Sequence, residues 1–101
     1  MNTCPDLDEI RKALKVCFKD KSIRAFLFGS RATGTARYNS DWDIGVLTDH
    51  PVPGHIMVKA RESLDSIRTL HSFDLVDFSK VNASFRNIAM SKMIPLLGEE
   101  T

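Results

Sequence analysis

Two aspartates, Asp41 and Asp43, stand two positions apart at the start of an apolar segment that runs to Leu47. In a strand, residues two apart share a face and lie roughly 6.6 Å apart along it, so both carboxylates could hold one or two hard cations such as Mg²⁺. Trp42 between them is then expected on the opposite face, in the core. The alternative interpretation is a polar strand entrance with two solvated aspartates. Like charges on one face repel, however, and a bound cation is a common reason for keeping them together.

Gly29 and Ser30 directly follow the apolar run of residues 23–28. Glycine permits close approach of a ligand, and the N–H groups at the start of a following helix could hold phosphate together with the Ser30 hydroxyl. Taken alone, Gly-Ser is also typical of an ordinary strand-to-helix turn. It lacks the Gly-Lys-Ser/Thr of the Walker motif and the three spaced glycines of dinucleotide-binding turns.

A third acidic candidate is Asp74, which lies within the apolar segment "FDLVDF" at residues 73–78. An unpaired carboxylate buried in such a strand is costly, so we expect Asp74 to be buried with a partner. Asp74 and Asp77 point to opposite faces, so at most one of them can join Asp41 and Asp43. Three carboxylates beside a phosphate-binding turn would suit two-metal phosphoryl or nucleotidyl transfer, with the third carboxylate as metal ligand and possible general base.

The elements that must position these residues follow from apolar spacing and from turn residues. We expect helices over residues 6–20, from Ile56 to Ile67, and in a final amphipathic segment with Phe85, Ile88, Ala89 and Met93 in its core-facing positions, ended by Pro95 and Gly98. Strands are expected at residues 23–28, 41–48 and 73–78, with a short helix or turn at 30–36 and a loop at 49–54. This α-β-α-β-α-β-α order predicts an α+β fold, in which helices flank a small mixed sheet of about three core strands, as a single domain over residues 1–101.

Composition narrows the classes of partner. Fourteen basic and thirteen acidic side chains give a net charge of +1, so no strong affinity for nucleic acid or for an anionic membrane is expected. We expect Cys4 and Cys17 to be free thiols. No secretory signal or membrane-spanning run is visible, so a cytoplasmic protein is expected. The histidines, His50, His55 and His71, lack metal-ligand spacing and are expected at the surface.

The segment "GSRATGTARYNSDWDIGV", residues 29–46, resembles the Gly-Ser-x-Ala-x-Gly and Ser-Asp-x-Asp signature of the polymerase-beta-like nucleotidyltransferase superfamily. With the later "FDLVDF", the chain looks like the minimal nucleotidyltransferases, known as MNT proteins. The resemblance implies the nucleotidyltransferase fold. It assigns Gly29 and Ser30 to the nucleotide phosphates, and Asp41, Asp43 and Asp74 to catalysis and to metal, with two Mg²⁺ ions.

The same resemblance gives expectations for the residues around these positions. Ala32 and Gly34 match positions that let the short helix pack against the sheet. Arg31 and Arg37 lie near enough in sequence to assist a triphosphate, but solvated surface is the favoured interpretation of both. Ser40 is expected to be a turn or cap residue.

The resemblance to minimal members of this superfamily implies the function of an antitoxin. Such antitoxins transfer AMP from ATP to a hydroxyl, usually of a tyrosine, on an all-helical HEPN toxin. The resemblance therefore implies ATP as substrate and a HEPN-type partner. The sequence leaves the oligomeric state open, with a homo- or a hetero-oligomer as alternatives. The alternative is a non-catalytic nucleotide-binding module that neutralises the partner by masking its active site. Transfer to a small molecule is disfavoured, because no segment remains to build a further substrate pocket.

Overall fold

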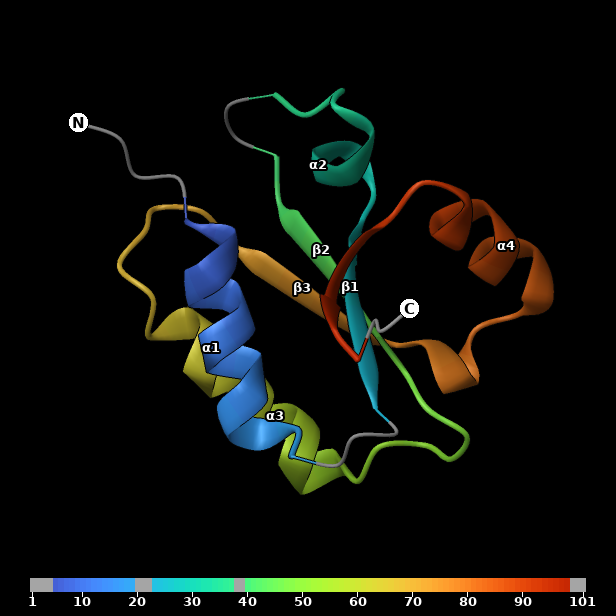
Figure 1. Cartoon of the computed structure of the whole chain (residues 1–101), viewed down its shortest axis with the longest axis horizontal. Helices are drawn as coiled ribbons and strands as arrows, with labels where there is room; N and C mark the ends of the chain where they lie inside the picture. Colours follow the sequence, from blue (N-terminus) through green and yellow to red (C-terminus); the bar gives the residue numbers. More distant parts are fainter. Residues whose placement is uncertain (1–4, 20–22, 38–39, 99–101) are drawn as a thin grey trace.

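The computed structural model describes residues 5–19, 23–37 and 40–98. In this part of the chain one four-stranded sheet has the order β3-β2-β1-β4 (Figure 1). The strands are β1 (Arg24–Phe28), β2 (Trp42–Leu47), β3 (Phe73–Asp77) and β4 (Ile94–Leu97). Strand β1 is antiparallel to both β2 and β4, whereas β2 and β3 are parallel. The sheet is therefore mixed, as the sequence predicts.

Helices connect and cover these strands. They are α1 (Leu7–Cys17), α2 (Ser30–Thr33), α3 (Gly54–Asp65), the 3₁₀ helix η1 (Phe78–Lys80) and α4 (Ala83–Ser91). Helix α1 begins at a capping box, in which the Asp6 side chain accepts from the first turn and Glu9 bonds back to the Asp6 backbone. Asn82 caps α4 by accepting from the Phe85 N–H at 2.8 Å. Local side chains thus define where both helices start.

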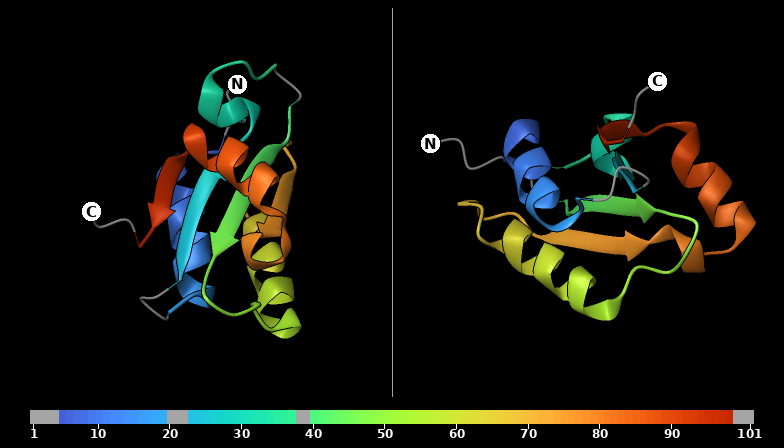
Figure 2. Two further views of the ribbon diagram at one scale, coloured as in Figure 1. Left: turned by 90° about the vertical axis from the view of Figure 1, so that its right-hand side faces the viewer. Right: turned by 60° about the horizontal axis from the view of Figure 1, so that its bottom comes forward.

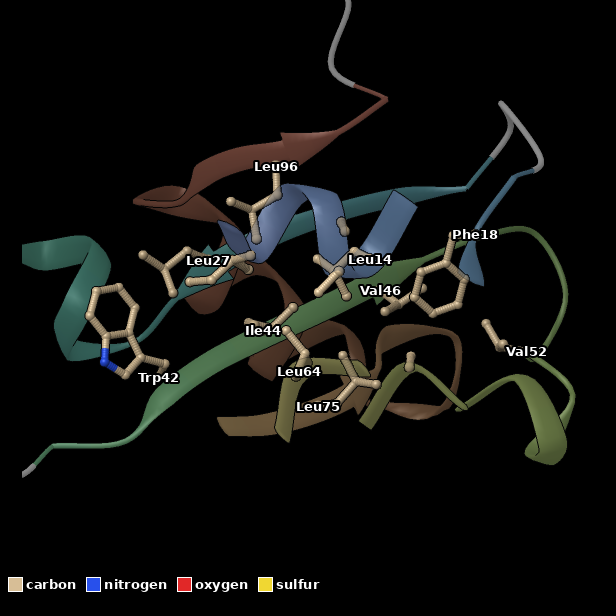
Figure 3. Close-up of a cluster of buried hydrophobic side chains, with 14 residues drawn as sticks. Leu14, Phe18, Leu27, Trp42, Ile44, Val46, Val52, Leu64, Leu75 and Leu96 are labelled. Atoms are coloured by element: carbon tan, nitrogen blue, oxygen red, sulfur yellow. The ribbon is translucent and has the colours of Figure 1, made fainter. Parts of the chain in front are cut away.

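The sheet buries both of its faces, and the alternation of side chains along β1 shows how. Ala25 and Leu27 face α1 and α3, in a first core cluster that also includes Trp42 (Figure 3). Phe26 and Phe28 face the other way, in a second cluster with Phe78 and with Ala89 of α4. In agreement, α4 lies on the opposite side of the sheet from α1 and α3 (Figure 2).

Strand β4 was not expected. The predicted final helix ends at Ser91, and residues 94–97 then pair with β1 instead of forming coil after Pro95. A proline is tolerated there because β4 is an edge strand of the sheet, where not every N–H is needed for pairing. The sheet therefore has four strands, one more than the core expected from the sequence.

The final helix also packs differently from the prediction. Phe85 and Ile88, expected in the core, are 42% and 74% exposed, whereas Ala89 is buried and Met93 is partly buried against the second cluster. The helix is only nine residues long, so it covers the sheet with a narrow stripe and leaves apolar side chains in solvent. This prediction was wrong for Ile88 and right only in part for Phe85, whose ring still contacts the rings of Phe28 and Phe78.

Two further expectations concern the thiols and the membrane. Cys17 is a free cysteine, as predicted, and Cys4 lies outside the described residues. Across the described ranges, no helix combines the length and the apolar character that crossing a bilayer requires.

Candidate functional site

The carboxylates of Asp43 and Asp74 project from the same face of the sheet. Asp43 is in register with Asp74 across the parallel β2–β3 pair. Neighbouring strands lie about 4.8 Å apart, and residues directly opposite each other point to one face. Asp77 is in register with Val46 of the first core cluster, so it points the other way. The tertiary pairing thus decides a choice that the sequence period left open.

Asp41 lies just before β2, two residues from Asp43, and is exposed. Asp74 is exposed as well, so the expectation that it is buried with a partner was wrong. It lies near the start of β3, where the covering helices leave the sheet open. Trp42, between the two aspartates of β2, is buried in the first core cluster as predicted.

Electrostatics link the three carboxylates. Partial burial raises the pKa of Asp43, and the negative charges of Asp74 and then Asp41 raise it further. Oxygen ligands of this kind fit a hard cation such as Mg²⁺. Within the described residues, however, no group of three or more acidic, histidine or cysteine side chains is already arranged as a metal site.

Gly29 joins the candidate phosphate turn to this carboxylate pair. It follows β1, whose last residue, Phe28, is in register with Asp43. Gly29 has φ 74° and ψ −156°, a backbone conformation that essentially only glycine adopts. A Cβ atom at this position would collide with the Asp43 carboxylate. The backbone of the turn therefore lies directly against one of the predicted metal ligands.

Ser30 opens helix α2, and the Gly29 carbonyl accepts the N–H groups of Ala32 and Thr33 at 3.0 and 3.1 Å. The helix has four residues, none of them buried, and ends at Gly34 in the left-handed conformation. It lies beyond the end of β1, at the end of the sheet where β2 begins (Figure 1). The predicted phosphate and metal ends of the motif are therefore adjacent in space.

The sequence analysis favoured a solvated surface position for Arg31, but the structure shows its side chain half-buried and in contact with other residues. Its Nη2 donates to the Ser40 carbonyl at 2.8 Å and lies 3.2 Å from Nδ1 of His71. Its Cζ lies 4.7 Å from the centroid of the Trp42 ring. His71 is correspondingly half-buried instead of exposed, whereas His50 and His55 are exposed as expected. Neighbours along the sequence gave no sign of these contacts, because the partners come from β2 and from the segments that precede β2 and β3.

Arg37 and Ser40 agree with their predictions. The Arg37 side chain is exposed, and its backbone N–H donates to the Ser40 hydroxyl at 2.9 Å. Ser40 therefore acts as a turn residue.

The sequence left the role of Asp77 open, and the structure shows that its carboxylate accepts hydrogen bonds from neighbouring segments. Its carboxylate accepts from the Val52 N–H at 3.0 Å and from the Ser79 N–H and hydroxyl at 3.0 and 2.7 Å. Burial acts to raise the pKa of Asp77, but these hydrogen bonds and the charge of Lys80 outweigh it and lower the pKa overall.

Two cavities lie elsewhere in the molecule. One, of about 570 Å³, is lined by residues that include Arg24, at the start of β1, and Arg86. The other, of about 310 Å³, is lined by residues that include Cys17 and His50. Neither is lined by any of the five predicted site residues. Among the candidate site residues, Asp41 and Asp74 are exposed, whereas Gly29, Ser30 and Asp43 are half-buried.

Solved structures that resemble this one include the following three. A chain of a toxin–antitoxin crystal structure with AMP-PNP has a TM-score of 0.76 and 26% identity, over 95% of this chain and 76% of that one. A chain of a mutant MntA–HpeT toxin–antitoxin complex has a TM-score of 0.75 and 23% identity, over 95% of this chain and 76% of that one. A chain of a complex of a tri-AMPylated Shewanella oneidensis HEPN toxin with MNT antitoxin has a TM-score of 0.60 and 19% identity, over 93% of this chain and 74% of that one. The last two likenesses concern the fold alone.

Comparison of the sequence with family models, and not with single curated proteins, identifies the family. No curated protein matches the chain. A family model described as "Polymerase beta, Nucleotidyltransferase" matches residues 10–100, which is nearly the whole sequence. This match and the shared fold confirm the family expected from the motif, and the chain belongs to the polymerase beta nucleotidyltransferases.

Proposed function

We propose that this protein is a Mg²⁺-dependent nucleotidyltransferase that transfers AMP from ATP to a hydroxyl, on a tyrosine, of a HEPN-type toxin, and so acts as its antitoxin. The observation that carries the proposal is the in-register pair Asp43 and Asp74 on one face, with Gly29 packed against Asp43. The 26% identical structure with AMP-PNP supports adenine nucleotide as the ligand. The AMPylated toxin in the complex with an MNT antitoxin supports a toxin as the acceptor.

The residues divide the chemistry among them. The Gly29 backbone and the Ser30 hydroxyl would hold the phosphates, and the carboxylates of Asp41, Asp43 and Asp74 would hold two Mg²⁺ ions. Such ions neutralise the phosphates and lower the pKa of the attacking hydroxyl. The tyrosine oxygen would form a bond to the α-phosphorus while the bond to the pyrophosphate leaving group breaks, and Asp74 would accept the proton of the tyrosine hydroxyl.

The test uses the purified protein, a HEPN toxin partner, Mg²⁺ and ATP labelled at the α-phosphate. We expect the label on the toxin, with a mass gain of one AMP. The double variant Asp41→Asn, Asp43→Asn should lose at least about a hundredfold in rate, because it removes the ligands of the metals. Asp49→Asn, at an exposed loop position, is the matched control and should label normally. Undiminished labelling by the double variant would contradict the proposal.

Masking of the toxin is the second candidate, and the exposed Phe85 and Ile88 favour it. Both lie on α4, the helix that covers the same sheet face from which Asp43 projects. Exposed apolar side chains grouped on one helix are typical of a surface covered by a partner. If the double variant still protects cells from the toxin while no AMP appears on it, masking is the mechanism. Loss of both protection and labelling identifies catalysis.

A further inference from the structure

We propose that Arg31 is the positioning residue of the candidate site: one guanidinium holds together the three chain segments that carry the phosphate turn, the Asp41/Asp43 pair and Asp74. The inference rests on the proposed function, since the site that Arg31 organises is the proposed one. It assigns a role to a residue that the sequence interpretation placed on the solvated surface.

The first connection joins the phosphate turn to the aspartate pair. Arg31 directly follows Ser30 in α2, and its Nη2 donates to the carbonyl of Ser40, the residue before Asp41, at 2.8 Å. The guanidinium also lies over the ring of Trp42, between the two aspartates in sequence, with Cζ 4.7 Å from the ring centroid. A movement of Arg31 would therefore displace both chain neighbours of Asp41, which are Ser40 and Trp42.

The second connection reaches the segment that leads into β3. The same Nη2 lies 3.2 Å from Nδ1 of His71, three residues before Asp74. The rings of Trp42 and His71 meet edge to face, with centroids 6.3 Å apart. The backbone N–H of Trp42 donates to the Ser72 carbonyl at 2.9 Å, which extends the β2–β3 pairing to the same place.

The geometry requires arginine. Helix α2 has four residues, of which Ala32 is partly buried against the first core cluster and none is fully buried, so its own packing fixes its position only weakly. A planar guanidinium can donate in its plane and stack on an aromatic ring at the same time, which the ammonium of lysine cannot reproduce. Arg31 thus supplies the orientation that the short helix lacks.

The experiment measures nucleotide binding instead of turnover, and uses Trp42, the single tryptophan of the chain, as its fluorescent reporter. Wild type, Arg31→Met, Arg31→Lys and Arg37→Met are titrated with AMP-PNP in the presence of Mg²⁺, and isothermal calorimetry repeats each titration without the reporter. Arg37→Met is the matched control, because Arg37 lies in the same segment but its side chain is exposed.

We expect Arg31→Met to weaken binding by about tenfold or more, because small displacements of site groups are costly. Arg31→Lys should fall between wild type and Arg31→Met, and Arg37→Met should bind like wild type. His71→Phe keeps the ring contact with Trp42 but removes the nitrogen that faces Arg31. It should weaken binding several-fold, and its effect should be smaller when Arg31 is already methionine.

Each outcome has a separate meaning. If wild type itself does not bind AMP-PNP with Mg²⁺, the proposed function is wrong. If wild type binds and Arg31→Met matches Arg37→Met at a temperature where circular dichroism shows both folded, Arg31 does not position the site. If Arg31→Met does not fold, His71→Phe decides: wild-type affinity in a folded His71→Phe protein overturns the link to β3.

Discussion

At the scale of single residues, Gly29 is constrained twice. Its backbone conformation excludes side chains, and the space for a Cβ is already taken by the Asp43 carboxylate. Gly34, five residues later and directly after α2, also has positive φ, but no atom outside its own chain neighbours lies within 4 Å of where its Cβ would be. The two glycines therefore differ both in backbone conformation, which is more restrictive at Gly29, and in contact with the site.

We expect Gly29→Ala to lower the free energy of unfolding by about 1–3 kcal/mol more than Gly34→Ala does, since it adds a collision to the strain. Urea unfolding of both variants measures the difference. Gly29→Ala should also weaken nucleotide binding, because the Asp43 carboxylate must move. Equal losses of stability in the two variants would show that the contact with Asp43 is unimportant.

The raised pKa of Asp43 predicts a pH dependence of stability. Between its ordinary value of 3.8 and the raised value, the folded protein binds more protons than the unfolded chain, so the free energy of unfolding falls as pH rises through this window. Asp43→Asn should therefore raise the melting temperature by a few degrees near pH 7, and the gain should vanish below the ordinary carboxyl range.

Thermal unfolding followed by circular dichroism measures this effect, with the exposed Asp49→Asn as control. Saturating Mg²⁺ should reduce or reverse the advantage of Asp43→Asn, because only the wild type keeps the ligand. A melting temperature that drops at neutral pH without Mg²⁺ would contradict the electrostatic picture of the site.

At the scale of elements, Asp77 ties three of them together. Asp77 is the last residue of β3, and its carboxylate caps η1 by accepting from the Ser79 N–H. The same carboxylate accepts from the N–H of Val52, in the loop that precedes α3. Both oxygens are used, so an amide cannot replace the carboxylate completely. The sequence shows an aspartate in an apolar strand, but only the fold shows that it is a structural acceptor.

Asp77→Asn should destabilise the protein by about 1–3 kcal/mol at neutral pH, because it removes one acceptor from buried donors. Since the pKa of Asp77 is lowered, its contribution is present above the ordinary value of 3.8 and is lost as pH falls through the lower folded value. Urea unfolding across the acid range checks both statements. Ser79→Ala, which removes only one hydroxyl, should cost less, and an equal cost would contradict this account.

The elements also differ in how well the sequence predicts them. The strands β1, β2 and β3 lie within a residue or so of their predicted bounds, because continuous apolar runs stopped by glycine or polar residues are typical of buried strands. Strand β4 could not be predicted from Ile94–Leu97, since four residues that include a proline have little strand character. Its pairing with β1 supplies the stability, and this pairing is a long-range contact.

At the scale of the whole molecule, long helices cover both faces of the sheet, whereas the short helix α2 lies at the end where β1 stops and β2 begins. Helices α1 and α3 close one face, and α4 covers the other over the phenylalanine cluster (Figure 2). Asp43 and Asp74 lie on the α4 side, near the end where β2 and β3 begin and β1 stops. At this end Asp74 is exposed and Asp43 is half-buried.

The sequence by itself determined the family and the α+β class, because the spacing of Gly29, Ser30, Asp41 and Asp43 and the order of apolar segments are local properties. It also predicted Trp42 in the core. Only the tertiary structure decided that Asp74 and not Asp77 faces Asp43, because that depends on the register of two strands separated by α3. The role of Arg31 depended on the fold for the same reason: its partners, Ser40, Trp42 and His71, meet it only after the sheet has formed.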